Sequence, residues 1–86
     1  IMNITRSDGK NIPFAADIYD EQGNVIGNVG QGGQAFVRGI EQQGNISIKW
    51  LEESKPVSCL AHYQQSSEAE KIAQSIILNG IRCQIQ

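Results

Sequence analysis

The residues best suited to hold a phosphate are the glycines of one short stretch. Gly27–Ala35 reads GNVGQGGQA, and from Gly30 onward it matches the pattern G-x-G-x-x-G/A. In dinucleotide-binding proteins such glycines form a tight turn after a strand, and the first amides of the next helix hold the pyrophosphate. Here the following residues, Phe36–Ile40, are mostly β-formers and include a glycine where that helix needs its second turn. The stretch therefore predicts a bulged turn between strands at Val25–Val29 and Ala35–Gly39, and no nucleotide site.

Two other groups of residues have side chains that can do chemistry, but neither has the partners that it needs. His62 is the only histidine, and no carboxylate or nucleophile lies near it in the sequence, so we expect it on the surface. Asp17, Asp20 and Glu21 lack the ligand spacing and the terminal glutamate of a calcium loop. We therefore expect no enzyme activity, no cofactor and no metal site.

Cys59 and Cys83 are the only cysteines, and they are too far apart for a C-x-x-C redox motif. Together with the single histidine they are too few for a structural zinc site, which needs four such ligands. A disulfide is therefore favoured over two buried free thiols. A loop of this length adds about 3 kcal/mol of stability, and the bond would place the protein in an oxidising compartment.

Composition narrows the class of protein further. The chain has 86 residues, enough for one domain with a modest core, and 7 basic against 9 acidic residues give a net charge of −2. These charges form no basic footprint for nucleic acid or an anionic membrane. The longest apolar run, Ile76–Leu78, is far too short for a membrane-spanning helix. Because Ile1 is not an initiator methionine, we expect a fragment, in which residues 1–86 form a single domain of a longer chain.

Most of the sequence alternates between apolar and polar residues, as half-buried strands do. Phe14, Ala16 and Ile18 are predicted on one face of a strand, with Asp17 and Tyr19 on the other. The same alternation predicts these further inward residues: Ile46, Ile48 and Trp50; Val57, Cys59, Ala61 and Tyr63; Ile81, Cys83 and Ile85. On this pattern Trp50 is a core residue rather than an exposed anchor. Turn residues at intervals of about 8 to 12 predict an all-β sandwich or barrel.

One segment has a different period. Ser67–Glu70 has the spacing of a capping box, and apolar residues follow it at helical intervals. We predict one short helix near residues 67–74, after which the chain becomes extended.

Several parts of the sequence together resemble the C-terminal domain of outer-membrane ushers. The resemblance covers Ile12–Tyr63, with Cys83 as the matching second cysteine, and is carried by these residues: Pro13–Ala16 (PFAA), Asp20–Gln34 (DEQGNVIGNVGQGGQ), Phe36–Gly39 (FVRG), Trp50, Cys59 and Tyr63. The sequence departs from the family at Ala15, where relatives tend to have glycine, and in the helical pattern of its tail.

The resemblance implies a fold and a function. The fold would be a small Greek-key β-sandwich of about seven strands, transthyretin-like or immunoglobulin-like, with a disulfide. The domain would lie on the periplasmic side of the Gram-negative outer membrane and would not itself span it. There it would dock chaperone–subunit complexes while pilus or capsular fibres are assembled and secreted, next to other domains of the same usher. The alternative is a structural β-sandwich module of another secreted or cell-surface protein.

Two surfaces are candidates for partner binding. Strand alternation turns Tyr19, Ile26 and Leu60 outward, and exposed apolar groups are typical of transient partner sites. The second candidate surface is the glycine turn and the strand after it, with the following side chains: Gln31, Gln34, Phe36 and Arg38.

Overall fold

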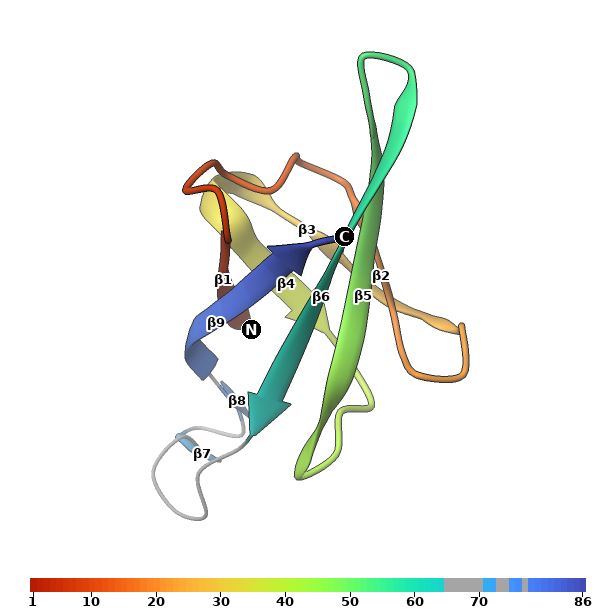
Figure 1. Ribbon diagram of the computed structural model, residues 1–86. Helices are drawn as coiled ribbons and strands as arrows, with labels where there is room; N and C mark the ends of the chain where they lie inside the picture. Colours follow the sequence, from red (N-terminus) through yellow and green to blue (C-terminus); the bar gives the residue numbers. More distant parts are fainter. Residues whose placement is uncertain (65–70, 73–74, 77) are drawn as a thin grey trace.

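The computed structural model describes residues 1–64, 71–72, 75–76 and 78–86, and these residues form an all-β domain (Figure 1). The elements in chain order are β1 (Met2–Arg6), β2 (Asp17–Tyr19), β3 (Val25–Val29), the 3₁₀ turn η1 (Gln31–Gly33), β4 (Gln34–Val37), β5 (Gln43–Glu52), β6 (Lys55–Gln64), β7 (Lys71–Ile72), β8 (Ser75–Ile76) and β9 (Leu78–Ile85).

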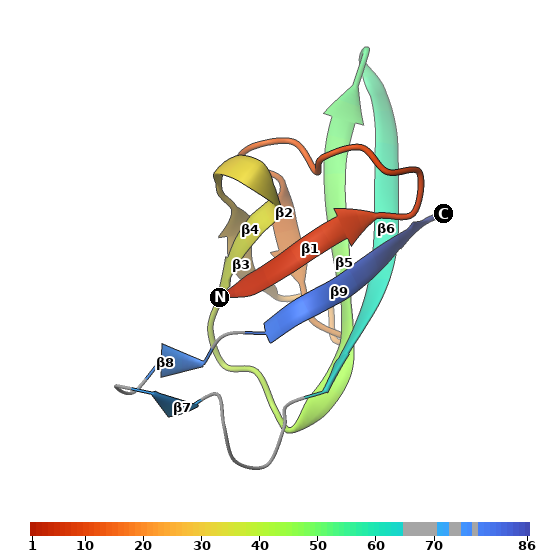
Figure 2. The same ribbon diagram turned by 90° about the vertical axis from the view of Figure 1, so that its left-hand side faces the viewer.

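Seven of the strands form one closed barrel in the order β1-β4-β3-β2-β5-β6-β9, and β7 pairs with β8 separately. All neighbours in the barrel are antiparallel except β1 and β9, which run parallel, side by side (Figure 2). The all-β fold of seven main strands is confirmed, but the predicted Greek-key sandwich is replaced by a closed barrel. The ring closes because β1 pairs with β4 on one side and with β9 on the other. Alternation alone does not separate these folds, since a sandwich and a barrel each bury one face of every strand.

The sequence did not predict β1. Its inward residues are Met2, Ile4 and Arg6, so a charged residue stands at the third inward position and conceals the alternation.

The core contains nearly all of the residues that alternation placed inside. Ile18, Ile46, Ile48, Cys59 and Cys83 are fully buried. Trp50, Ala61, Tyr63 and Ile81 are buried as well, and Val57 and Ile85 pack against the core. The prediction that Trp50 is a core residue is confirmed.

Phe14 is an exception to the alternation, because 71% of its surface is exposed. β2 begins only at Asp17, and the chain bends sharply at Ala15, where φ is +72°. The predicted strand is therefore shorter at its start, and Phe14 lies in the loop before it.

The predicted helix near residues 67–74 lies mostly outside the described residues. Of its residues the structure describes Lys71–Ile72, which form strand β7 and not helix. The extended chain predicted after it is confirmed in β9.

The glycine stretch forms the predicted turn between two strands. Gly32 and Gly33, with φ of +67° and +78°, make a three-residue 3₁₀ turn that leads directly into β4. A side chain at Gly33 would stand 2.6 Å from the carbonyl oxygen of Ile4, so the absence of one lets the turn approach β1. The glycine turn is thus followed by a strand, and not by an α-helix whose first amides could hold a phosphate.

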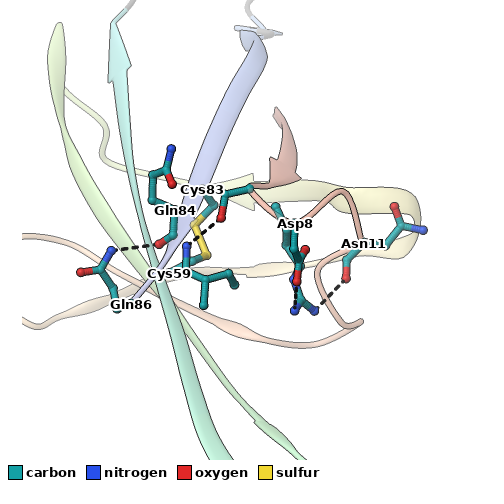
Figure 3. The surroundings of a disulfide bond; sticks show 9 residues. Asp8, Asn11, Cys59, Cys83, Gln84 and Gln86 are labelled. Atoms are coloured by element: carbon teal, nitrogen blue, oxygen red, sulfur yellow. Dashed lines mark hydrogen bonds and ion pairs between the residues drawn. A yellow bond between two sulfur atoms is a disulfide. The ribbon is translucent and has the colours of Figure 1, made fainter.

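Cys59 and Cys83 form a disulfide that joins β6 to β9 (Figure 3). The register pairs Cys59 with Ile85 and Ala61 with Cys83, so the two cysteines are diagonal neighbours on the inner face. The predicted disulfide therefore fixes the last strand of the barrel beside β6.

Candidate protein-docking groove

The most exposed large apolar side chains of the described residues meet at one groove. Phe14 and Leu51, each 71% exposed, line it from different elements, and its volume is about 510 Å³. The remaining lining residues are Pro13, Ala15, Ala16, Asp17, Tyr19, Lys49, Trp50 and Pro56. This docking groove combines aromatic, aliphatic and proline side chains with few charges.

One wall of the docking groove is the loop before β2. The Ala15 amide donates to the Val29 carbonyl at 2.7 Å, and the Ala16 amide donates to the Pro13 carbonyl at 3.3 Å. These bonds close a tight turn in which Ala15 takes the left-handed conformation that glycine usually provides. The turn directs Phe14 out of the sheet and into solvent.

The other wall is the turn end of the β5–β6 hairpin, residues Trp50–Val57, which we call the hairpin arm. Pairing of β5 with β2 ends at Lys49, and pairing of β6 with β9 ends at Cys59. The arm therefore extends beyond the other strands as a two-stranded ribbon (Figures 1 and 2). Its two-residue turn has positive φ at Glu53 and Ser54, the geometry that matches the twist of a hairpin.

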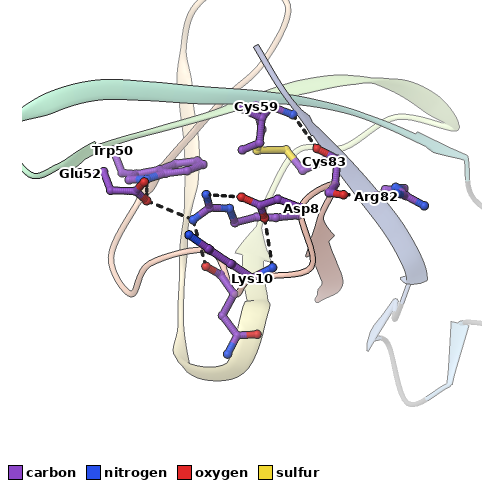
Figure 4. Close-up of polar contacts among 11 residues, drawn as sticks. Asp8, Lys10, Trp50, Glu52, Cys59, Arg82 and Cys83 are labelled. Carbon is purple, nitrogen blue, oxygen red and sulfur yellow. Dashed lines mark hydrogen bonds and ion pairs between the residues drawn. A yellow bond between two sulfur atoms is a disulfide. The ribbon is translucent and has the colours of Figure 1, made fainter.

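A buried arginine lies between the hairpin arm and the loop after β1. Arg6 is 5% exposed, and its guanidinium bonds to Asp8 at 2.8 Å and to Glu52 at 3.2 Å. The guanidinium carbon is 5.1 Å from the centre of the Trp50 ring. Asp8 from the loop after β1 and Glu52 from β5 therefore approach one polar cluster from opposite sides (Figure 4).

The two carboxylates of this cluster have lowered pKa values. The Trp50 indole N–H, which donates to Glu52 at 3.3 Å, is the largest cause that lowers the pKa of Glu52, followed by the hydrogen bond from Arg6. For Asp8 the main cause is the backbone amide of Lys10, and Arg6 lowers its pKa further. Both carboxylates therefore stay charged, and paired with Arg6, to a lower pH than ordinary carboxyl groups would.

The candidate residues Tyr19 and Leu60 share the outer face of the barrel. Tyr19 pairs with Ser47, which in turn pairs with Leu60, so both side chains lie in one row across three strands. Tyr19 is half-buried beneath Lys49, whose ammonium is 4.8 Å from the ring centre, while Leu60 is 43% exposed.

Ile26 does not lie on that outer face. The register jumps from the Ile18–Gly27 pair to the Tyr19–Val25 pair, so Ile26 is the extra residue of a bulge. The bulge reverses the alternation, which leaves Val25 49% exposed and packs Ile26 against the core. The prediction of an outward Ile26 is therefore wrong.

The second candidate surface is separate from the docking groove. Phe36 and Arg38 line a smaller hollow with Ile1 and Val37, and the Phe36 ring packs over Gly30. Phe36 is 51% exposed, and these further candidates are exposed as well: Gln31, Gln34 and Arg38.

Sequence reasoning missed Phe14, Leu51 and Arg6 as site residues. Alternation contained a signal for Leu51, which is out of phase with the inward Ile46, Ile48 and Trp50. No comparable signal marked Arg6, because its partners come from distant parts of the chain.

The described residues contain no group of three or more metal-ligating side chains. His62 is exposed and lies 3.1 Å from the side-chain oxygen of Asn45. In the part of the chain that the structure describes, no helix is long and apolar enough to cross a membrane.

The fold and the site together define a class of protein: a small all-β domain with an internal disulfide and an apolar groove on its surface. Residues 1–67 match the PapC C-terminal domain family, and the chain belongs to this family. The predicted membership in the C-terminal domains of outer-membrane ushers is thereby confirmed.

Individual proteins with similar sequences are ushers as well. The chain is 98% identical over 86 residues to the outer membrane usher protein HtrE of Escherichia coli K12, covering all of this chain and 10% of HtrE. It is 31% identical over 71 residues to the usher FimD of the same organism, covering 83% of this chain and 8% of FimD. The chain thus spans about a tenth of the length of these relatives, which are outer membrane ushers.

Two solved structures share the fold. The Caf1A usher C-terminal domain superposes with a TM-score of 0.78 at 23% identity, covering 98% of this chain and 93% of Caf1A's. The PapC usher C-terminal domain gives a TM-score of 0.71 at 22% identity, covering 96% and 94% of the two chains.

Proposed function

We propose that this domain binds chaperone–subunit complexes on the periplasmic side of the outer membrane during the assembly and secretion of pilus or capsular fibres. The observation that carries the proposal is the docking groove, in which Phe14 and Leu51 are exposed in a domain of an usher family. Support comes from the Caf1A relative, whose surface hydrophobic clusters are important for F1 antigen assembly.

The chemistry of the groove suits a transient protein partner. Phe14 and Leu51 are exposed anchors, and Asp17 and Lys49 lie at the edge of the same groove. Apolar anchors with a polar rim are typical of interfaces that must form and then release. Tyr19 also lines the groove, while Leu60 and the second candidate surface around Phe36 and Arg38 remain secondary contact candidates, for the partner or for other domains of the same usher. The disulfide agrees with an oxidising periplasm.

The direct test is a binding titration of the purified chain with a chaperone–pilus subunit complex from the same bacterium. Replacing Phe14 and Leu51 by serine together removes both anchors, so we expect affinity to fall at least about tenfold. The matched control is Val25→Ser, which changes an apolar side chain with 49% exposure outside the groove and should bind as the wild type does.

Each other result has a definite meaning. Unchanged affinity of the folded double variant would remove the groove from the proposal. Failure of the wild-type chain to bind, at low salt and high concentration, would favour a purely structural module instead.

A further inference from the structure

We propose that Arg6 is the positioning residue of the docking groove. It ties the hairpin arm to the loop that carries Phe14, and so it sets how Leu51 faces Phe14. This inference rests on the proposed function, because it assigns a purpose to the geometry of the same groove.

The first argument is where the arginine makes its contacts. Arg6 ends β1, and the next residues form the loop that leads to Phe14. Its guanidinium donates to the Asn11 carbonyl in this loop at 3.4 Å and to Glu52 of the arm at 3.2 Å. One side chain therefore connects the hairpin arm with the loop that leads to Phe14.

The second argument is the weak support of the arm by neighbouring strands. Among the described residues, β2 pairs with β5 only up to Lys49, and β9 pairs with β6 only from Cys59 onward. A two-stranded ribbon without further neighbours is only marginally stable. Contacts of Arg6 with the Trp50 ring at the base of the arm and with Glu52 next to its turn hold the arm to the barrel.

The third argument is the cost of burying this side chain. The Nε atom of Arg6 is buried and has no hydrogen-bond partner, although the two terminal nitrogens are bonded. A buried donor without a partner reduces stability, and a buried ion pair is weak evidence for a gain in stability. The burial of this arginine is therefore better explained by the geometry that it enforces than by a gain in stability.

The planar guanidinium suits this task in a way that an ammonium does not. Its two terminal nitrogens diverge toward Asp8 and Glu52 while its carbon lies 5.1 Å from the centre of the Trp50 ring. Lysine offers a single point charge and lacks this fixed fork. Arg6→Lys should therefore restore only part of what Arg6→Met removes.

The experiment measures hydrogen exchange of individual amides together with binding of the chaperone–pilus subunit complex. In Arg6→Met we expect amides of Trp50–Val57 to exchange at least about tenfold faster, while amides of β6 beyond Cys59 keep their rates. Affinity for the complex should fall about tenfold, with Arg6→Lys intermediate. Arg82→Met is the matched control, because it removes an exposed arginine that bonds the Ser7 carbonyl of the same loop but does not line the groove.

If Arg6→Met does not fold, a second variant can test the same inference. Glu52→Gln removes a charge from a side chain that is 44% exposed and should also speed exchange in the arm. The inference is overturned if a folded Arg6 or Glu52 variant exchanges and binds like the wild type while the Phe14 and Leu51 double variant loses binding. That outcome leaves the proposed function standing, whereas a wild type that does not bind removes it.

Discussion

At Ala15 the Cβ atom makes the observed backbone conformation unfavourable. Ala15 has φ of +72°, a region that costs a residue with a Cβ roughly 1–2 kcal/mol, yet its amide bond to Val29 holds it there. The glycine that the family resemblance implied at this position would take the left-handed conformation without this cost. Ala15 is thus a site of local backbone strain in the docking groove.

We predict that Ala15→Gly stabilises the chain by about 0.5–1 kcal/mol. Relief of the left-handed strain exceeds the extra entropy that glycine gives the unfolded chain. Urea unfolding followed by the fluorescence of Trp50 would measure the change. A lower unfolding midpoint for the glycine variant would contradict the strain at this position.

At the scale of elements, the β2–β3 turn is organised by one carboxylate. Asp20 accepts hydrogen bonds from the amides of Gln22 and Asn24, each at 2.9 Å, and from the Asn24 side chain at 3.3 Å. The bond from the Asn24 amide is the main cause that lowers the pKa of Asp20. The ionised carboxylate therefore substitutes for backbone partners in the turn.

This turn should weaken in acid. Because the folded pKa of Asp20 lies below its unfolded value, its contribution is complete above the unfolded value and is lost as pH falls through the folded one. We expect Asp20→Ala to be less stable than the wild type at pH 7 and to lose less stability between pH 5 and about pH 2. Urea midpoints across that range would show it.

Glu21→Ala serves as the control for the acid experiment, since it removes a neighbouring carboxylate for which no turn hydrogen bond is seen. Equal acid sensitivity of the wild type and Asp20→Ala would assign the loss of stability to other carboxylates.

Strands were predicted correctly from the sequence wherever the alternation of apolar and polar residues continued without interruption. Ile46, Ile48 and Trp50 alternate regularly, and their strand was found with the correct inner face. The prediction was wrong where tertiary contacts interrupt the period, as at the bulge that turns Ile26 inward and at the bend of Ala15 that exposes Phe14. The candidate site was predicted less well, because its walls come from segments that only the fold brings together.

At the scale of the molecule, the disulfide supports a small core. Cys59 and Cys83 are both fully buried and join two strands of the barrel. We predict that replacing both by alanine lowers the free energy of unfolding by about 3 kcal/mol. Intact mass after thiol alkylation would first confirm that the native protein has no reactive thiol, and urea unfolding would then give the loss. A double variant as stable as the wild type would show that the closed barrel does not depend on the bond.

The parallel pairing of β1 with β9 also has a mechanical consequence. The two outermost strands of the chain run in the same direction, with Met2 opposite Leu78 and Arg6 opposite Cys83. A pull on the two ends of the chain in opposite directions would slide these strands past each other. Their hydrogen bonds would then share the load in shear, instead of opening one after another as in a hairpin pulled from its ends. This pairing therefore opposes a force that pulls β1 and β9 apart along their length.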